Sequence, residues 1–196
     1  MNVQLEVENK SEKKQIILET MLDLIDEHGL QGVPMSLLAK KASVAAGTIY
    51  HYFESKEAMI LELFFYTRDR IDHEIFKMKD RSTDEYGSRF KSLWIHLCLY
   101  YIEHPKVLSF LDQFFSSPFH KRIRVEETQL YESNFASFLQ QGIEMGKIKN
   151  HGMQIIIPVF YGALVIAAKK QVDQPDTFSL SDLETMAQVI WDGLKV

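Results

Sequence analysis

Residues 38–56 read LAKKASVAAGTIYHYFESK and contain two short helical patterns that meet at a turn around Ser43 and Val44. The second pattern, residues 45–53, is rich in hydroxyl and aromatic side chains. Helices this short are not stable alone in water and depend on packing against other parts of a protein. We therefore expect the rest of the chain to hold this pair in place.

The remaining sequence favours helices. Among 196 residues there are only five prolines and nine glycines, and the alternation of β-branched residues that is typical of strands is scarce. Apolar residues recur at helical spacing in nine stretches, so we expect an all-α fold of nine helices, with residues 1–10 as a loose arm. The expected helices cover residues 11–28, 34–42, 45–53, 56–79, 88–104, 107–115, 121–145, 153–171 and 180–194.

The turn-linked pair has the pattern of a helix-turn-helix, which places its second helix in the major groove of DNA. The hydroxyls of Thr48, Tyr50 and Tyr52 are able to donate to phosphate oxygens, and the start of the next helix, with Lys56 beside it, is a natural anion site. Gly47 costs about 1 kcal/mol of helix stability relative to Ala, which a close approach to DNA would explain. An ordinary helical hairpin with aromatic side chains on its surface accounts for the same periodicity.

The formal net charge of −5 argues against nucleic acid as a partner, because phosphate binding normally needs a basic surface. The charge is unevenly distributed, however. Between residues 36 and 56 three lysines, Lys40, Lys41 and Lys56, stand against one acid, Glu54. An acidic protein with a mildly basic end is still able to turn that end toward DNA.

The segment VAAGTIYHYFESKEAMI resembles the DNA-binding signature of the TetR/AcrR family of transcriptional regulators, and the matching pattern extends over residues 11–65. The resemblance implies one set of residues that hold the DNA backbone and another set that face the bases. The implied backbone contacts are Thr48, Tyr50, Tyr52 and Lys56, the implied base-facing residues are Ala46, Gly47 and His51, and Ser36 matches a further contact position.

The sequence departs from the family pattern at two places. Ser43 stands where the family usually has a glycine in the turn, and Ala45 and Ala46 replace the more usual serine followed by a polar or basic residue. Alanine offers no hydrogen bond to a base edge. Recognition would therefore depend on contact with thymine methyl groups, on His51 and on the shape of the DNA.

The resemblance also implies a helix-turn-helix DNA-binding domain over residues 1–55 and a ligand-binding and dimerisation domain over residues 56–196. The second region is dense in aromatic residues, which suits a pocket for a small, largely apolar or aromatic effector, although many of these rings are equally explained as core. Pro158 in mid-helix either bends the helix to open a cavity or eases packing. The candidate ligand-binding residues are Trp94, Leu97, Tyr101, Phe114, Phe138 and Tyr161.

Small residues at Gly162, Ala163 and Ala167 lie in the helix expected over 153–171, and large apolar residues follow in the helix over 180–194. Two copies of this helix pair could pack as a four-helix bundle, or the last helix could close its own monomer. The resemblance favours a homodimer through these two helices.

Catalytic and metal-binding patterns are missing from the sequence. The seven histidines are scattered, and neither a Gly-x-Ser-x-Gly nor a phosphate-loop motif occurs, so we expect no enzyme activity, no cofactor and no metal site. The single cysteine, Cys98, excludes an internal disulfide. The N-terminus has no apolar signal segment, and the apolar run at residues 155–168 is shorter than the roughly 20 residues of a membrane span, which predicts a cytoplasmic protein.

These features together predict a ligand-responsive transcriptional regulator. We expect a repressor that is released from a palindromic DNA operator by a small-molecule effector. The pair Ala45 and Ala46 leaves an alternative, in which the chain is a helical small-molecule binding protein with weakened or no specific DNA binding.

Overall fold

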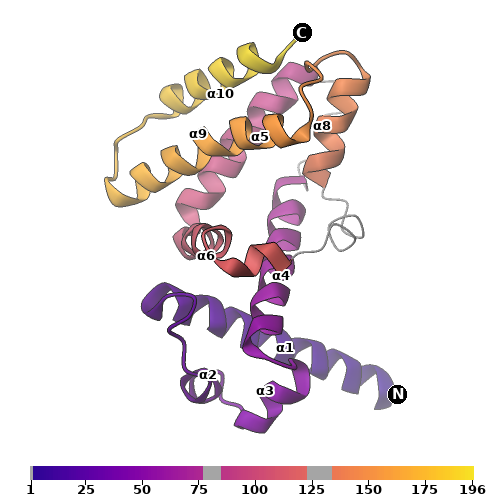
Figure 1. Ribbon diagram of the computed structural model, residues 1–196, viewed down its shortest axis with the longest axis vertical. Helices are drawn as coiled ribbons and strands as arrows, with labels where there is room; N and C mark the ends of the chain where they lie inside the picture. The colour runs from indigo at the N-terminus through magenta and orange to yellow at the C-terminus, as the bar shows by residue number, and fades with distance from the viewer. Residues whose placement is uncertain (1, 77–84, 123–133) are drawn as a thin grey trace. The chain divides into compact units, whose positions relative to one another are not determined.

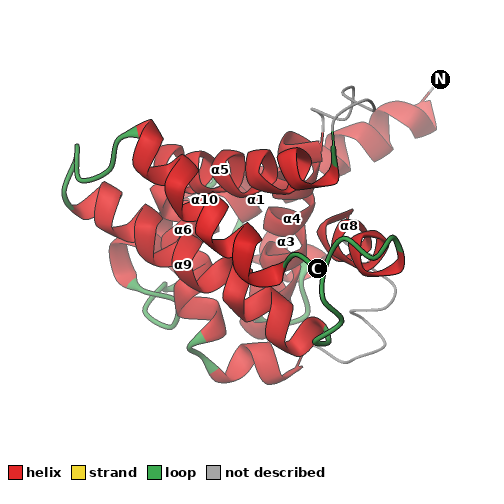
Figure 2. Cartoon of the chain, turned by 90° about the horizontal axis from the view of Figure 1, so that it is seen from above, coloured by secondary structure: helices red, strands yellow, loops and turns green. Residues whose placement is uncertain are grey.

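The computed structural model describes residues 2–76, 85–122 and 134–196. Over these ranges the chain is helical and has no β-strand (Figure 2), apart from an isolated bridge between Ile148 and Lys195. The nine α-helices of the described chain confirm the expected all-α architecture. In chain order (Figure 1) the elements are α1 (Asn2–His28), α2 (Met35–Lys41), α3 (Ala46–Tyr52), α4 (Lys56–Phe76), α5 (Tyr86–Glu103), α6 (Pro105–Phe115), the 3-10 helix η1 (Pro118–Arg122), α8 (Asn134–Glu144), α9 (Met153–Asp173) and α10 (Leu180–Leu194).

One expected helix boundary needs correction, and two expected helices extend into residues that the structure does not describe. The expected loose arm at residues 1–10 is wrong for residues 2–10, because α1 begins at Asn2; no proline or glycine interrupts the chain before Gly29. The helix expected over 121–145 is described only as the end of η1 and as α8, and residues 77–79 of the expected fourth helix also lie outside the described residues.

The chain forms two compact units. The N-terminal unit contains residues 1–67 and 109–125, and the C-terminal unit contains residues 68–108 and 126–196. Both boundaries fall inside helices, α4 and α6, so each of these helices contributes to both units. The functional boundary expected between residues 55 and 56 remains a prediction.

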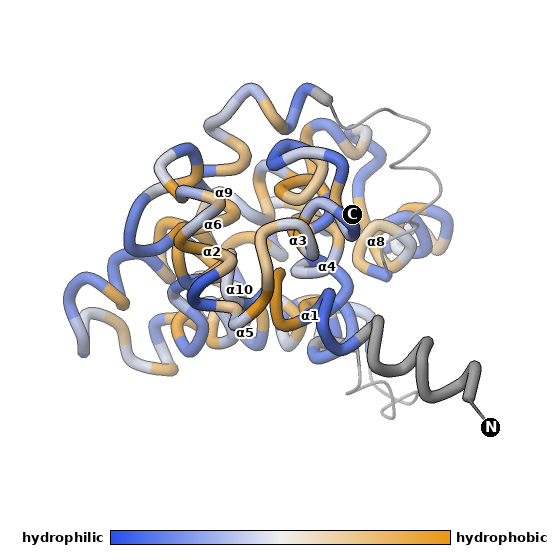
Figure 3. The backbone as a smooth tube through the Cα atoms, turned by 90° about the horizontal axis from the view of Figure 1, so that it is seen from below, coloured by the Kyte–Doolittle hydropathy of each residue, from blue (hydrophilic) through white to orange (hydrophobic). Residues whose placement is uncertain are grey.

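The core of the N-terminal unit is built from residues at helical spacing. Apolar and polar residues alternate along the helices (Figure 3), and the apolar positions are the ones that become buried. The ring of Phe64 on α4 stacks on the ring of Phe114 at the end of α6, with 4.5 Å between ring centroids. The least exposed side chains are Ile17, Met21 and Ile25 of α1, Leu38 of α2, Ile49 of α3, Met59, Ile60 and Leu63 of α4, and Phe110 and Phe114 of α6.

In the C-terminal unit α5 packs against α9 and α10. The indole N–H of Trp94 on α5 donates to the backbone carbonyl of Phe160 on α9 at 3.0 Å, and both side chains are fully buried. The helix α9 continues through Pro158, which is exposed. A capping box between Ser179 and Asp182 starts α10.

Candidate nucleic-acid interface

The turn between α2 and α3 is centred on Ser43. Its φ of +55° lies in the left-handed region, and the N–H of Val44 donates to the carbonyl of Ala39 at 3.0 Å. The family pattern usually has a glycine at this position, and the backbone of Ser43 has the conformation that glycine adopts most easily. A residue with a Cβ costs about 1–2 kcal/mol in this conformation, so Ser43 carries local strain.

The helix α3 is held by two apolar residues on one side. Ile49 and Phe53, four residues apart, are 1% and 3% exposed and pack into the N-terminal unit. The base-facing residues implied by the family resemblance, Ala46, Gly47 and His51, are all exposed. The structure therefore directs this side of α3 away from its own core.

The residues implied as backbone contacts are less uniform. Tyr50 is 55% exposed, whereas Thr48 and Tyr52 are partly buried. The ring of Tyr52 contacts the ring of His51 edge to face, with 5.6 Å between centroids. Ser36 is exposed at the start of α2, a helix that packs against α3. The exposed hydroxyls of Ser36 and Tyr50 are thus presented by two neighbouring helices.

Lys56 makes two hydrogen bonds to the backbone that the sequence did not predict. Its ammonium donates to the carbonyl of Gln31 at 2.7 Å and to the carbonyl of Val33 at 2.8 Å. Partial burial lowers the pKa of Lys56, and the neighbouring carboxylate of Glu57 acts in the opposite direction. Because an ammonium has three N–H donors, one remains for a phosphate oxygen. Lys56 also ties the loop after α1 to the start of α4.

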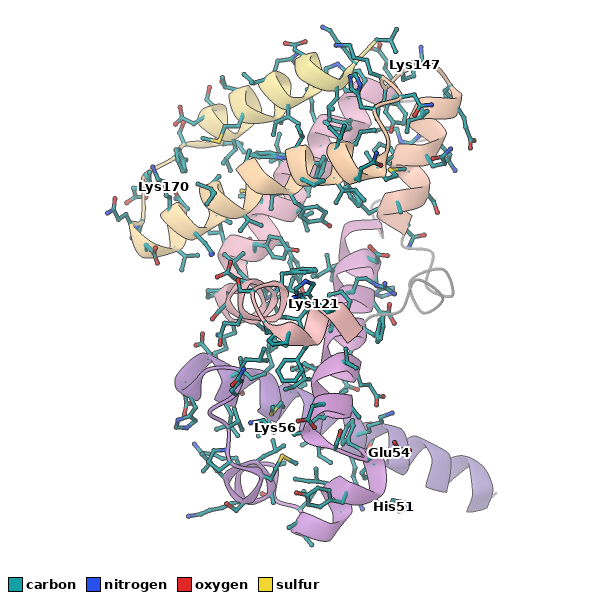
Figure 4. All side chains as sticks on the ribbon, in the orientation of Figure 1. His51, Glu54, Lys56, Lys121, Lys147 and Lys170 are labelled. Atoms are coloured by element: carbon teal, nitrogen blue, oxygen red, sulfur yellow. The ribbon has the colours of Figure 1, made fainter. Side chains whose placement is uncertain are left out.

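Charged side chains lie where α3 ends and α4 begins. Figure 4 labels His51, Glu54 and Lys56 in this region. The hydroxyl of Ser55 accepts a hydrogen bond from the N–H of Ala58 at 3.0 Å and so caps α4. Lys40 and Lys41 are exposed at the end of α2. Between residues 36 and 56, three lysines thus stand against one acid, and Glu57 follows in the first turn of α4.

The candidate effector-binding residues do not form one group. Phe114 belongs to the N-terminal unit, where it stacks on Phe64. Phe138 stacks on Tyr86 with 4.7 Å between centroids, and Leu97 is 2% exposed. Together with Trp94, these residues have packing contacts that explain their presence, and their role toward an effector stays a prediction.

Tyr101 on α5 and Tyr161 on α9 have a different environment. Burial raises the pKa of both phenols, and the carboxylate of Asp72 on α4 raises them further. Asp72 was missed by the sequence analysis, because a single acid in a long helix normally lies in solvent. The C-terminal unit thus places a carboxylate near two buried or half-buried tyrosines.

One face of α9 is apolar and exposed. Ile155, Val159 and Ile166 are 49%, 45% and 57% exposed, and Gly162 and Ala163 are exposed on the same stripe. A Cβ added at Gly162 would meet nothing within 4 Å. Within the described chain α9 is the one helix long and apolar enough to cross a membrane, with 28% of its most apolar window buried.

Two family models match this chain, one in its N-terminal part and one in its C-terminal part. Residues 17–63 match the family model of bacterial regulatory proteins of the tetR family, and residues 86–195, more than half of the chain, match the tetracyclin repressor-like C-terminal domain. The first match covers α2, α3 and the turn between them.

Among curated proteins, an uncharacterized HTH-type transcriptional regulator of Haemophilus influenzae is 33% identical over 107 residues. That match covers 51% of this chain and 53% of the relative, so the chain spans about half of that protein's length. A fatty acid metabolism regulator protein of Bacillus subtilis is 26% identical over 147 residues, which cover 73% of this chain and 74% of that protein.

The fold is shared with a solved structure of a TetR family transcription regulator from Marinobacter aquaeolei. The two chains have a TM-score of 0.82 at 20% identity, and the comparison covers 96% of this chain and 98% of that one. The expectation that the chain is a regulator rather than an enzyme agrees with these matches. With the family models covering both its turn-linked helices and its C-terminal helices, the chain belongs to the TetR family of helix-turn-helix transcriptional regulators.

Proposed function

We propose that this regulator is a cytoplasmic homodimeric repressor that leaves a near-palindromic operator when a small, largely apolar effector binds to its C-terminal unit. The observation that carries the proposal is the exposed side of α3, where Ala46, Gly47, Tyr50 and His51 all face outward from a helix anchored by buried Ile49. A helix presented in this way is suited to enter the major groove.

The exposed apolar stripe of α9 supports a dimer. Isolated apolar residues are common on protein surfaces, but a continuous stripe of Ile155, Val159 and Ile166 with small residues between them suits a partner helix at close range. We call residues 155, 159, 162, 163 and 166 the α9 stripe. A partner copy that covers this stripe would explain why so apolar a helix is largely unburied in one chain. A two-fold dimer would place two α3 helices on successive turns of a palindromic site.

The effector response is supported by the C-terminal unit. Its aromatic residues include Tyr101 and Tyr161, whose environment differs from plain core packing. The relative from Bacillus subtilis is named a fatty acid metabolism regulator, which is consistent with an effector that has an apolar body. Coupling between an effector and DNA of about 1–3 kcal/mol would be enough to release an operator occupied near its midpoint.

Fluorescence anisotropy with labelled duplexes that tile the region around the protein's own gene tests the proposal. We expect saturable binding to one palindromic fragment, with an affinity that falls steeply as salt is raised. The variant Tyr50→Ala should weaken this binding about tenfold or more, since Tyr50 is a candidate phosphate contact.

Phe115→Ala is the matched control, because Phe115 lies in the same unit outside the helix-turn-helix and is 56% exposed, almost the same as the 55% of Tyr50. It should leave DNA affinity unchanged. If no fragment binds, the alternative of a small-molecule binding protein without specific DNA binding is favoured. If both variants lose affinity equally, Tyr50 is not a specific phosphate contact.

A further inference from the structure

Two polar contacts join α1 to α4, which cross in the N-terminal unit (Figure 1). The ammonium of Lys14 on α1 forms an ion pair with the carboxylate of Glu62 on α4. The phenol of Tyr66, four residues further along α4, donates a hydrogen bond to Oε1 of Glu19 on α1. Residues four apart lie on the same face of a helix, so the N-terminal half of α4 is attached to α1 along one face.

Lys14 also contacts the end of α3. Its Nζ lies 5.6 Å from the centroid of the ring of Phe53, the residue that follows the last turn of α3. A cation within about 6 Å of an aromatic centroid is attracted by the ring. Phe53 is buried, and its N–H donates to the carbonyl of Ile49 at 3.0 Å, so this ring is firmly part of α3. One ammonium on α1 therefore contacts both the end of α3 and the side of α4.

The surroundings of Lys14 differ from those of a lysine that binds phosphate. Its side chain is 37% exposed, and the carboxylate of Glu62 already balances its charge. Lys40 and Lys41 at the end of α2, by contrast, are exposed. Lysines add to DNA affinity mainly by neutralising phosphates and releasing their counterions, which an ammonium held by a carboxylate does less well. Lys14 is thus better suited to hold α3 and α4 than to contact DNA.

We propose that Lys14 is a positioning residue for DNA binding. It fixes the end of α3 and the N-terminal half of α4 to α1, so that the exposed side of α3 meets the major groove in one orientation. A binding element that is fixed before it meets its partner loses less entropy on binding. Breaking the contact between Lys14 and Glu62 therefore weakens DNA binding even when the chain remains folded. The inference rests on the proposed entry of α3 into the major groove.

Glu62→Gln in the full chain tests the proposal through the sign of its effect. If only net charge mattered, removing an acid from the DNA-binding unit would strengthen the attraction to phosphates. We expect the opposite: fluorescence anisotropy with the labelled palindromic duplex should show affinity about threefold to tenfold weaker, because Lys14 loses its partner on α4. Thermal melts establish that the variant is folded at the assay temperature. Glu12→Gln is the matched control, since Glu12 is exposed on α1 and the change in charge is the same. It should leave the affinity unchanged or raise it.

Lys14→Met keeps the apolar stem of the side chain and removes the cation. It should weaken DNA binding by a similar factor, and the slope of log affinity against log salt should stay as in the wild type, because a positioning residue releases no counterion. A direct phosphate contact would instead make that slope shallower by about one. The double variant of Lys14→Met and Glu62→Gln should bind no more weakly than Lys14→Met alone, since both changes break the same contact.

The proposal is overturned if folded Glu62→Gln binds the duplex as tightly as the wild type or more tightly, or if Lys14→Met makes the salt slope shallower. If Glu62→Gln did not fold, the salt slope of Lys14→Met would decide alone. The wild-type titration separates this inference from the proposed function. A wild-type chain that binds no duplex removes both, whereas a wild-type chain that binds DNA beside a Glu62→Gln variant of undiminished affinity keeps the proposed function and loses only the positioning role.

Discussion

The side-chain carbonyl of Gln113 accepts a hydrogen bond from the backbone N–H of Leu30 at 2.7 Å, across 83 residues of sequence. Leu30 directly follows Gly29, whose φ of +74° ends α1. The residue after Gln113, Phe114, stacks on Phe64 of α4. The last turns of α6 are therefore attached within the N-terminal unit both to the exit of α1 and to α4.

Replacing Gln113 with alanine should lower the free energy of unfolding by about 1–3 kcal/mol, because the N–H of Leu30 would lose its acceptor in a partly buried place. Urea denaturation followed by circular dichroism measures this change. Gln113→Glu keeps an acceptor oxygen and should lose less. Equal stability of the alanine variant and the wild type would show that water replaces the amide without cost.

Lys56→Met keeps the apolar stem of the side chain and removes all three donors. The carbonyls of Gln31 and Val33 would lose their partner, which should cost about 1 kcal/mol of stability. The variant should also bind operator DNA more weakly with a smaller dependence on salt, if the third donor contacts phosphate. Parallel thermal melts and anisotropy titrations separate the two losses, and weaker folding with unchanged DNA affinity would restrict Lys56 to its structural contacts.

Gly162→Leu tests the α9 stripe as a dimer contact. A Cβ at this position meets nothing within 4 Å in one chain, so the monomer should fold normally. A closely packed partner helix would be pushed away at a cost of about 1–3 kcal/mol, which raises the dimer dissociation constant by tenfold or more. Analytical ultracentrifugation measures the constant.

Gly142→Ala provides the contrast to this variant. A Cβ at Gly142 would overlap the hydroxyl of Tyr86, which itself donates to the carbonyl of Phe138 at 2.9 Å. This variant should melt at a lower temperature, because packing inside the C-terminal unit is disturbed. A Gly162→Leu protein that dimerises like the wild type would place the interface elsewhere.

Asp72→Asn should make the chain more stable at neutral pH. The pKa of Asp72 is raised by burial, so the folded chain binds this proton more tightly than the unfolded chain does. Stability linked to Asp72 is therefore greatest at low pH, where the group is protonated in both states, and it is lost as pH rises through the unfolded pKa to the folded one.

The amide of asparagine carries no charge, so the gain in stability should be clear at pH 7 and should disappear below pH 4. Its side-chain oxygen still accepts from the Asn134 N–H. Urea titrations at several pH values check the expected curve. If the variant were less stable than the wild type at pH 7, the ionised carboxylate of Asp72 would make favourable interactions that outweigh the cost of its burial.

The helices could be predicted because their apolar residues repeat at a regular interval. Ile49 and Phe53, four residues apart, were enough to place α3 within one residue of its observed ends. The start of α1 was missed since residues 1–10 lack a clear apolar period, and periodicity is the signal on which the prediction depended. Because Ile49 marks the buried side of α3, Ala46 and Tyr50 could be expected on its exposed side.

Contacts between distant residues could not be predicted. Gln113 and Leu30 are 83 residues apart, and Asp72 and Asn134 are 62 apart, so neither pair leaves a local pattern in the sequence. Aromatic residues gave a further difficulty. The sequence grouped Phe114 with Tyr101 as candidate effector contacts, but Phe114 stacks on Phe64 in the core of the N-terminal unit. Sequence alone does not separate an aromatic residue that packs in a core from one that lines a pocket.

Ala46 is exposed in the first turn of α3, and the buried residues that anchor the helix lie elsewhere, at Ile49 and Phe53. Substitutions at such a surface position usually change stability by less than about 0.5 kcal/mol. The position that the family resemblance assigns to base contact is thus free from the constraints that preserve the fold. Duplicated copies of a gene with this arrangement can diverge in operator preference one substitution at a time, without first acquiring compensating changes in the core.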